Sequence, residues 1–155
     1  MKRAMMVSVA GFAVACLISM VPQPARASDT PTQKVEPAAQ RIVAMYFHRP
    51  QRCPTCLKMG SYTEEAVTTG FPKEIKGGTV ALYFIDFQDE KNAALTKGYQ
   101  ITGPALIVAR IDGKKVVEFK NLTEIWSKVR DKEEFIKYVQ GNVSVYQKDT
   151  KTSAK

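Results

Sequence analysis

Short apolar runs, separated by turn-forming residues, dominate the middle of this chain. The first two runs are apolar at successive positions instead of alternating with polar residues, which is typical of strands buried on both faces. After the third run, Asp112-Gly113 is a strong tight-turn signal, so the fourth run should pair back antiparallel. The predicted strands are 41–47, 79–87, 105–111 and 115–120.

Between these strands, two segments have the features of helices. The longer one, 53–69, should stop at Gly70, and Pro72 should prevent its continuation. The shorter one, 92–99, contains consecutive alanines and should end near Gly98.

After the last strand the apolar period becomes helical. Asn121 and Glu124 approximate a capping box at the start of a helix over 122–129. Asp131 and Glu134 repeat that start signal, and Gly141 should stop the second helix. Two consecutive C-terminal helices are therefore expected.

The resulting order is strand, helix, strand, helix, strand, strand, helix. With right-handed crossovers, it predicts an α/β fold with a central mixed four-stranded sheet and helices on both faces. We expect one domain over 41–146 and a disordered tail over 147–155. The aromatic residues expected in its core are Tyr83, Phe84, Phe87, Phe119, Trp126 and Phe135.

The first 27 residues have the three parts of a secretory signal peptide: a basic start, an apolar stretch and a small-residue cleavage site. We expect cleavage after Ala27, and residues 28–40, rich in Pro, Ala and Thr, then form a flexible linker. A retained membrane anchor is an alternative, although about 18 apolar residues is short for a span. Lipidation of Cys16 is a third, because 13–16 loosely resembles a lipoprotein box.

Cleavage at this position would also change the charge and the cysteine content. The formal net charge falls from +8 to +5, and Cys16 is lost. The remaining basic residues are scattered along the chain, which argues against nucleic-acid binding. The exported protein would keep two cysteines in an oxidising compartment.

Those two cysteines, Cys53 and Cys56, lie three positions apart between the first strand and the first helix. At a helix start they share one face, close enough to join as a disulfide and to open again. Unpaired N–H groups and the helix dipole stabilise a thiolate at Cys53, and Pro54 suits the first helical position. The pattern favours electron exchange, with Cys53 attacking and Cys56 resolving.

The element order and this CxxC placement resemble the thioredoxin family over roughly 41–141. The segment 99–108, containing Gly103-Pro104, is similar to the stretch in which thioredoxins place a cis-proline against the cysteines to bind the substrate chain. The resemblance implies that substrate-binding role for Gly103 and Pro104. An ordinary turn with a trans proline is the alternative.

The chain also departs from thioredoxins. Arg52 precedes the first cysteine where thioredoxins usually have Trp, and no acid occupies the position of their buried aspartate. The Arg52 charge could favour the Cys53 thiolate, unless its side chain faces solvent. His48 could act as a nearby base, although a histidine at a strand end is commonly a hydrogen-bonded loop residue.

The longer motif 46–56 resembles exported thioredoxin-like proteins known as ArsF-type nitroreductase-associated subunits. Since no flavin or nicotinamide fingerprint occurs, we expect no cofactor, and nitroreductase chemistry would need another subunit as redox partner. Otherwise the partner is a protein or small-molecule thiol or disulfide. A membrane is a partner only if the N-terminal segment is retained or Cys16 is lipidated.

Two other functions remain open for the cysteine pair. Cu(I) could be carried by His48, Cys53 and Cys56 with Met45 or Met59, whereas a structural zinc site lacks enough ligands. The pair could also be a structural staple in an adaptor protein, although so small a ring removes little chain entropy. An exported thiol–disulfide oxidoreductase is the leading hypothesis.

Overall fold

The structure is a computed structural model that describes residues 40–153. The predicted signal peptide, Cys16 and the linker as far as residue 39 lie outside the described residues. Within the described part, no helix combines the length and apolar character needed to cross a membrane.

Four strands form one mixed sheet in the order β2-β1-β3-β4. The central strand β1 is parallel to β2 and antiparallel to β3, and β3 pairs antiparallel with β4. All four predicted strands are present. Their bounds are β1 Gln40–His48, β2 Val80–Asp86, β3 Ala105–Asp112 and β4 Lys115–Asn121.

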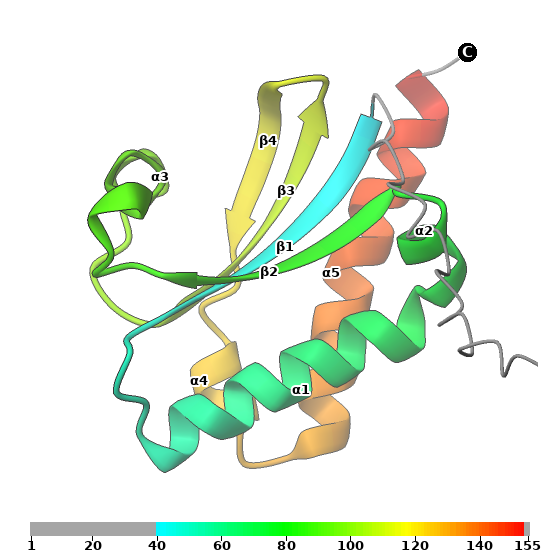
Figure 1. Cartoon of the computed structure of the whole chain (residues 1–155). Helices are drawn as coiled ribbons and strands as arrows, with labels where there is room; N and C mark the ends of the chain where they lie inside the picture. Colours follow the sequence, from blue (N-terminus) through cyan, green and yellow to red (C-terminus); the bar gives the residue numbers. More distant parts are fainter. Residues whose placement is uncertain (1–39, 154–155) are drawn as a thin grey trace, which may run out of the picture. The chain divides into compact units, whose positions relative to one another are not determined.

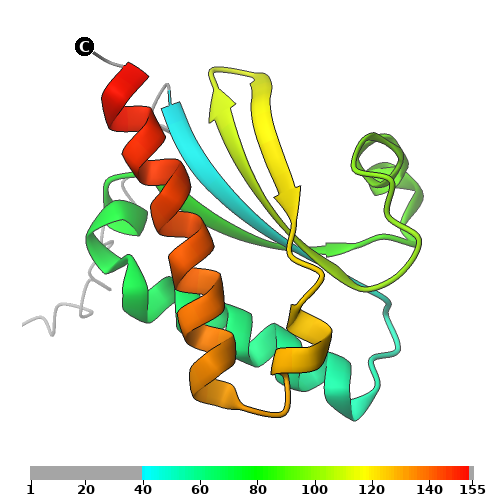
Figure 2. The same cartoon turned by 180° about the vertical axis from the view of Figure 1, so that it is seen from behind.

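Helices cover both faces of this sheet (Figures 1 and 2). The long helices α1 and α5 lie on one face, and the short α3 lies on the other. The predicted α/β class, with a central mixed four-stranded sheet and helices on both faces, is confirmed. The helices are α1 Pro54–Gly70, α2 Pro72–Lys76, the 3-10 turn η1 Glu90–Asn92, α3 Ala93–Gly98, α4 Ile125–Lys128 and α5 Lys132–Ser153.

The side chains of β1 divide the core into two clusters, because successive residues of a strand point to opposite faces. Ile42, Ala44 and Tyr46 pack beneath α1 and α5, in a cluster that includes Phe135 and Met59. The intervening residues pack on the α3 side with Tyr99 and Ile101. Both clusters therefore share the central strand. Its residues on the α3 side are Val43, Met45 and Phe47.

Helix α5 does not stop at Gly141, so that prediction is wrong. The helix runs through Gly141 to Ser153, and the predicted disordered tail over 147–155 is thus helical as far as Ser153. Beyond the glycine, Val143 and Tyr146 continue the buried stripe of the helix. Burial of their apolar side chains outweighs the cost of about 1 kcal/mol for an interior glycine.

Four of the six aromatic residues expected in the core are exposed. Tyr83 and Phe84 lie on β2 and Phe119 on β4, which are the two edge strands, and Trp126 lies on the single-turn helix α4. A strand pattern identifies apolar positions but not which strand is an edge, so it cannot predict the exposure of Tyr83, Phe84 and Phe119. Of the other two, Phe135 is fully buried and Phe87 is partly buried.

Candidate functional site: the cysteine pair at the start of α1

Cys53 is the N-cap of α1, and Pro54 is its first residue, as the sequence predicts. The Cys53 backbone is extended, and its Sγ accepts a hydrogen bond from the Cys56 N–H at 3.2 Å. Its carbonyl accepts from Leu57 N–H at 3.0 Å. The thiol therefore stands where the free N–H groups of the helix converge.

The sulfur atoms of the two cysteines lie 2.7 Å apart and are not joined as a disulfide. Cys53 is exposed, whereas Cys56, one turn deeper, is only 8% exposed. Hydrogen bonds from the Cys56 thiol and from the Cys56 backbone N–H lower the pKa of Cys53. Burial and the adjacent Cys53 raise the pKa of Cys56. The two thiols are thus chemically unlike: the accessible one ionises first.

Tyr46 fixes the first turn of α1 to the sheet. Its hydroxyl donates a hydrogen bond of 2.8 Å to the carbonyl oxygen of Cys56, and its ring is fully buried. Burial, reinforced by the nearby Cys56, raises the pKa of Tyr46 above its ordinary value. Tyr46 therefore stays protonated and acts as a donor, not as an internal base. In the sequence, the only signal for this role of Tyr46 is its place two residues before the end of the first strand.

His48 and Arg52 contact each other beside the cysteines. Arg52 Nη2 donates to His48 Nε2 at 2.8 Å, and His48 Nδ1 lies 3.0 Å from the Arg49 carbonyl oxygen. These contacts correspond to a neutral ring that carries its proton on Nδ1 and donates it to that carbonyl. The same guanidinium lies 5.9 Å from the centre of the Phe84 ring.

This arrangement places the two predicted tuning residues together but in unexpected roles. Both ring nitrogens of His48 are engaged, so the ring positions Arg52 and offers no free nitrogen to the thiols. The pKa of Cys53 is lowered by hydrogen bonds from Cys56 and from the backbone at the start of the helix. The sequence pattern could not show that Arg52 turns toward His48 and Phe84.

The Gly103–Pro104 bond is trans, since no cis peptide bond occurs within residues 40–153. The expected cis form is therefore wrong. Trans is favoured by about 0.5–1 kcal/mol at X-Pro bonds, and the bend before β3 forms without the cis isomer. Gly103 and Pro104 line a hollow of about 270 Å³ together with Leu122 and Trp126, beside α4.

The methionines considered as Cu(I) ligands lie apart from each other. Met59 is fully buried in the α1–α5 cluster, and Met45 belongs to the cluster on the opposite face of the sheet. Across residues 40–153, no three His, Cys, Asp or Glu side chains are grouped as metal ligands.

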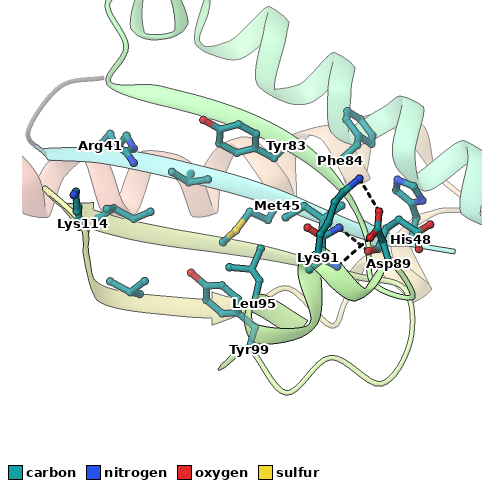
Figure 3. Close-up of a pocket in the computed structure, with 16 residues that line it drawn as sticks. Arg41, Met45, His48, Tyr83, Phe84, Asp89, Lys91, Leu95, Tyr99 and Lys114 are labelled. Atoms are coloured by element: carbon teal, nitrogen blue, oxygen red, sulfur yellow. Dashed lines mark hydrogen bonds and ion pairs between the residues drawn. The ribbon is translucent and has the colours of Figure 1, made fainter. Parts of the chain in front are cut away.

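A larger groove, of about 700 Å³, lies on the α3 face of the sheet. Figure 3 shows Met45 and Tyr83 on its strand side, and Leu95 and Tyr99 across from them. Arg41 and Lys114 lie at one end, and the ion-paired Asp89 and Lys91 lie at the other. This groove cannot be predicted from the sequence pattern, because it exists only where the short helix α3 leaves part of the sheet face uncovered.

Comparison with known protein families and with curated proteins found no match. Comparison with solved structures found chains similar at low identity. Chloroplastic thioredoxin z is 18% identical, with a TM-score of 0.35 over 61% of this chain and 80% of that one. A thioredoxin from Thermus thermophilus is 17% identical, with a TM-score of 0.35 over 58% and 72%.

A malarial protein is 16% identical, with a TM-score of 0.36 over 57% of this chain and 96% of that one. The assignment of fold class does not depend on these scores, because the strand order and strand directions establish it directly. The chain is an α/β protein with a mixed four-stranded sheet, and the solved structures it is similar to include two thioredoxins.

Proposed function

We propose that the chain is an exported thiol–disulfide oxidoreductase that uses Cys53 and Cys56. The observation that carries the proposal is the asymmetry of the two thiols. Cys53 is exposed and has a lowered pKa, and the sulfur of the buried Cys56 lies 2.7 Å behind it. Thiol–disulfide exchange needs an accessible thiolate that attacks first and a second thiol that then resolves the mixed disulfide.

The reaction proceeds through a mixed disulfide. The Cys53 thiolate attacks one sulfur of a substrate disulfide, the S–S bond breaks, and the departing thiolate takes up a proton. Cys56 then loses its proton and attacks Cys53 Sγ, which releases the second substrate thiolate. The substrate gains two electrons and two protons, and the cysteine pair becomes a disulfide. The reverse sequence oxidises a dithiol.

The groups around the pair support these steps. Tyr46 holds the first turn of α1 on the sheet while the Cys53–Cys56 bond forms and breaks. The lowered pKa of Cys53 stabilises the reduced state, which shifts the pair toward being an oxidant. Gly103 and Pro104 are the proposed substrate contact, by their resemblance to the thioredoxin loop.

Export is the other part of the proposal. Cleavage after Ala27 would deliver the domain, with its two cysteines, to a periplasmic or extracellular compartment. The N-terminal residue of the protein recovered from the periplasm or the medium, determined by mass spectrometry, tests this part. Recovery only with membranes, with the first 27 residues or a lipid on Cys16, would contradict it.

The redox proposal is tested by alkylation with iodoacetamide at a series of pH values. We expect Cys53 of the reduced protein to react with a midpoint below the ordinary thiol pKa of about 8.5. Cys56 should react only at higher pH, because its pKa is raised. The Cys56→Ser variant should trap mixed disulfides with substrates, and Cys53→Ser should not.

Two results would overturn the proposal. One is a disulfide that a glutathione buffer cannot open, combined with an ordinary pKa at both thiols after forced reduction. Such a pair would be a structural staple. The other is equal trapping by Cys53→Ser and Cys56→Ser, which would remove the assignment of nucleophile and resolver.

A further inference from the structure

The two edges of the sheet are protected to different degrees. The β4 edge contains Lys115, Glu118 and Lys120, and its pairing with β3 has a register irregularity at Arg110/Ile111. Charged side chains and bulges are the devices that keep exposed strand edges from pairing with other chains. The β4 edge is therefore protected.

The β2 edge has none of these devices. No charged residue occurs from Val80 to Ile85, and the only acid of the strand is its last residue, Asp86. Two aromatic residues are exposed there, Tyr83 at 52% and Phe84 at 38%, on opposite faces of the strand. A long, apolar, uncharged edge is a template for another strand.

The backbone of β2 shows which groups are free. Ile42 N–H donates to the Thr79 carbonyl, and Phe87 N–H donates to the His48 carbonyl. In a parallel ladder, alternate residues of a strand bond to the same neighbour. The backbone N–H and C=O groups of the odd-numbered residues of β2 therefore point toward β1. The backbone groups of the even-numbered residues point away from β1, toward the open edge of the sheet. The carbonyl of Asp86 already accepts from the Asn92 side chain at 2.8 Å.

Within residues 40–153, the outward-facing backbone groups of β2 without such a partner belong to Val80, Leu82 and Phe84. This set is symmetric about Leu82. We propose that a second copy of this chain pairs with this edge, antiparallel, with a two-fold axis at Leu82. Val80 and the partner's Phe84 then exchange hydrogen bonds, as do Phe84 and the partner's Val80. A two-fold interface uses the same patch on both copies, and this edge is complementary to itself.

Side-chain size agrees with this register. The exposed ring of Tyr83 falls opposite the small Ala81 of the partner, on the α3 face of the sheet. A hollow of about 290 Å³ lies beside Ala81 and is lined also by Ile75 and Gly78. It gives the incoming Tyr83 ring a place to pack.

The charges at the two ends of β2 are also complementary. Lys73, Glu74 and Lys76 on α2 precede the strand with a net charge of +1. Its outward-facing segment is followed by Asp86, Asp89, Glu90 and Lys91, with a net charge of −2, although Asp89 and Lys91 are ion-paired with each other. Antiparallel pairing brings the basic end of one copy to the acidic end of the other. The preceding residues of the chain are a poorer occupant, because 28–39 contains two prolines and a single β-branched aliphatic residue.

Sedimentation equilibrium of the purified protein, with its N-terminus defined by mass spectrometry, tests the proposal. We expect a reversible dimer, and Tyr83→Lys should raise its dissociation constant by about tenfold or more by placing a charge in the pairing edge. The matched control is Val117→Lys on the protected β4 edge, where the native residue is 46% exposed. It should leave the dissociation constant unchanged.

A second measurement fixes the register. With Cys53 and Cys56 replaced by serine, Leu82→Cys should oxidise to a covalent dimer, and Val117→Cys should stay monomeric. A protein that remains monomeric at the highest attainable concentration would overturn the proposal, as would equal effects of Tyr83→Lys and Val117→Lys. Amides of Val80, Leu82 and Phe84 that are protected in a monomer would instead assign the edge to the chain's own N-terminal segment.

Discussion

On one face of the sheet, the 17-residue helix α1 and the 22-residue helix α5 cover a large buried cluster. On the other face, α3 is six residues long and none of its residues is buried. The first face carries the cysteine pair, and the second leaves a groove of about 700 Å³. The helix that carries the cysteine pair is thus anchored on the face with the deeper core, where the Tyr46 hydroxyl holds its first turn in place.

The largest expected effect that tests this comparison is a loss of stability. Phe135 is fully buried under α1, so Phe135→Ala should lower the free energy of unfolding by about 3–5 kcal/mol. Leu95→Ala on α3, where the side chain is 36% exposed, should cost about 1 kcal/mol or less. Urea denaturation of both variants measures the difference. Similar losses in the two variants would mean that the two faces of the sheet contribute equally to the stability of the protein.

A smaller effect is expected where the deeper face meets the cysteine pair. Tyr46→Phe removes the hydroxyl that donates to the Cys56 carbonyl and should cost about 1 kcal/mol. The matched control is Tyr83→Phe, whose hydroxyl belongs to an exposed side chain and should change stability little. Thermal unfolding of the reduced proteins measures both. An unchanged melting temperature in Tyr46→Phe would show that this hydrogen bond does not anchor α1.

The smallest effect concerns α5 itself. Gly141 is exposed, its φ is not positive, and a Cβ there would meet no atom within 4 Å. Gly141→Ala should therefore stabilise the protein by about 0.5–1 kcal/mol. At Gly70 a Cβ would lie 2.7 Å from the Gln140 side chain, which donates to the Ala66 carbonyl. Gly70→Ala should therefore stabilise the protein less than Gly141→Ala does, or destabilise it. An equal gain in stability in both variants would contradict the tight contact between α1 and α5.

The sequence predicted the local features of the molecule well. Apolar runs predicted all four strands, and the position of Cys53 before Pro54 predicted the N-cap of α1. Such features depend on neighbouring residues, whose spacing is visible in the chain. The fold class followed from the order of the elements.

The remaining differences arise from contacts between distant segments. Tyr83 was expected in the core, because nothing local marks β2 as an edge strand. Helix α5 passes Gly141 because residues beyond it find a buried surface. The Arg52–His48 hydrogen bond depends on how the loop after β1 bends back. Strand order, burial and loop geometry are properties of the folded chain, so local patterns could not supply them.

The position of β1 has a consequence for the synthesis of the chain. This central strand is made first, and its antiparallel partner β3 follows only after roughly 60 more residues. At about 5–20 residues per second, the apolar segment around Val43 to Phe47 waits several seconds for that partner. During that time, the hydrogen-bonding groups of β1 that face β3 in the folded protein are open to other chains. The nascent chain is therefore most exposed to misassembly before Ala105 emerges.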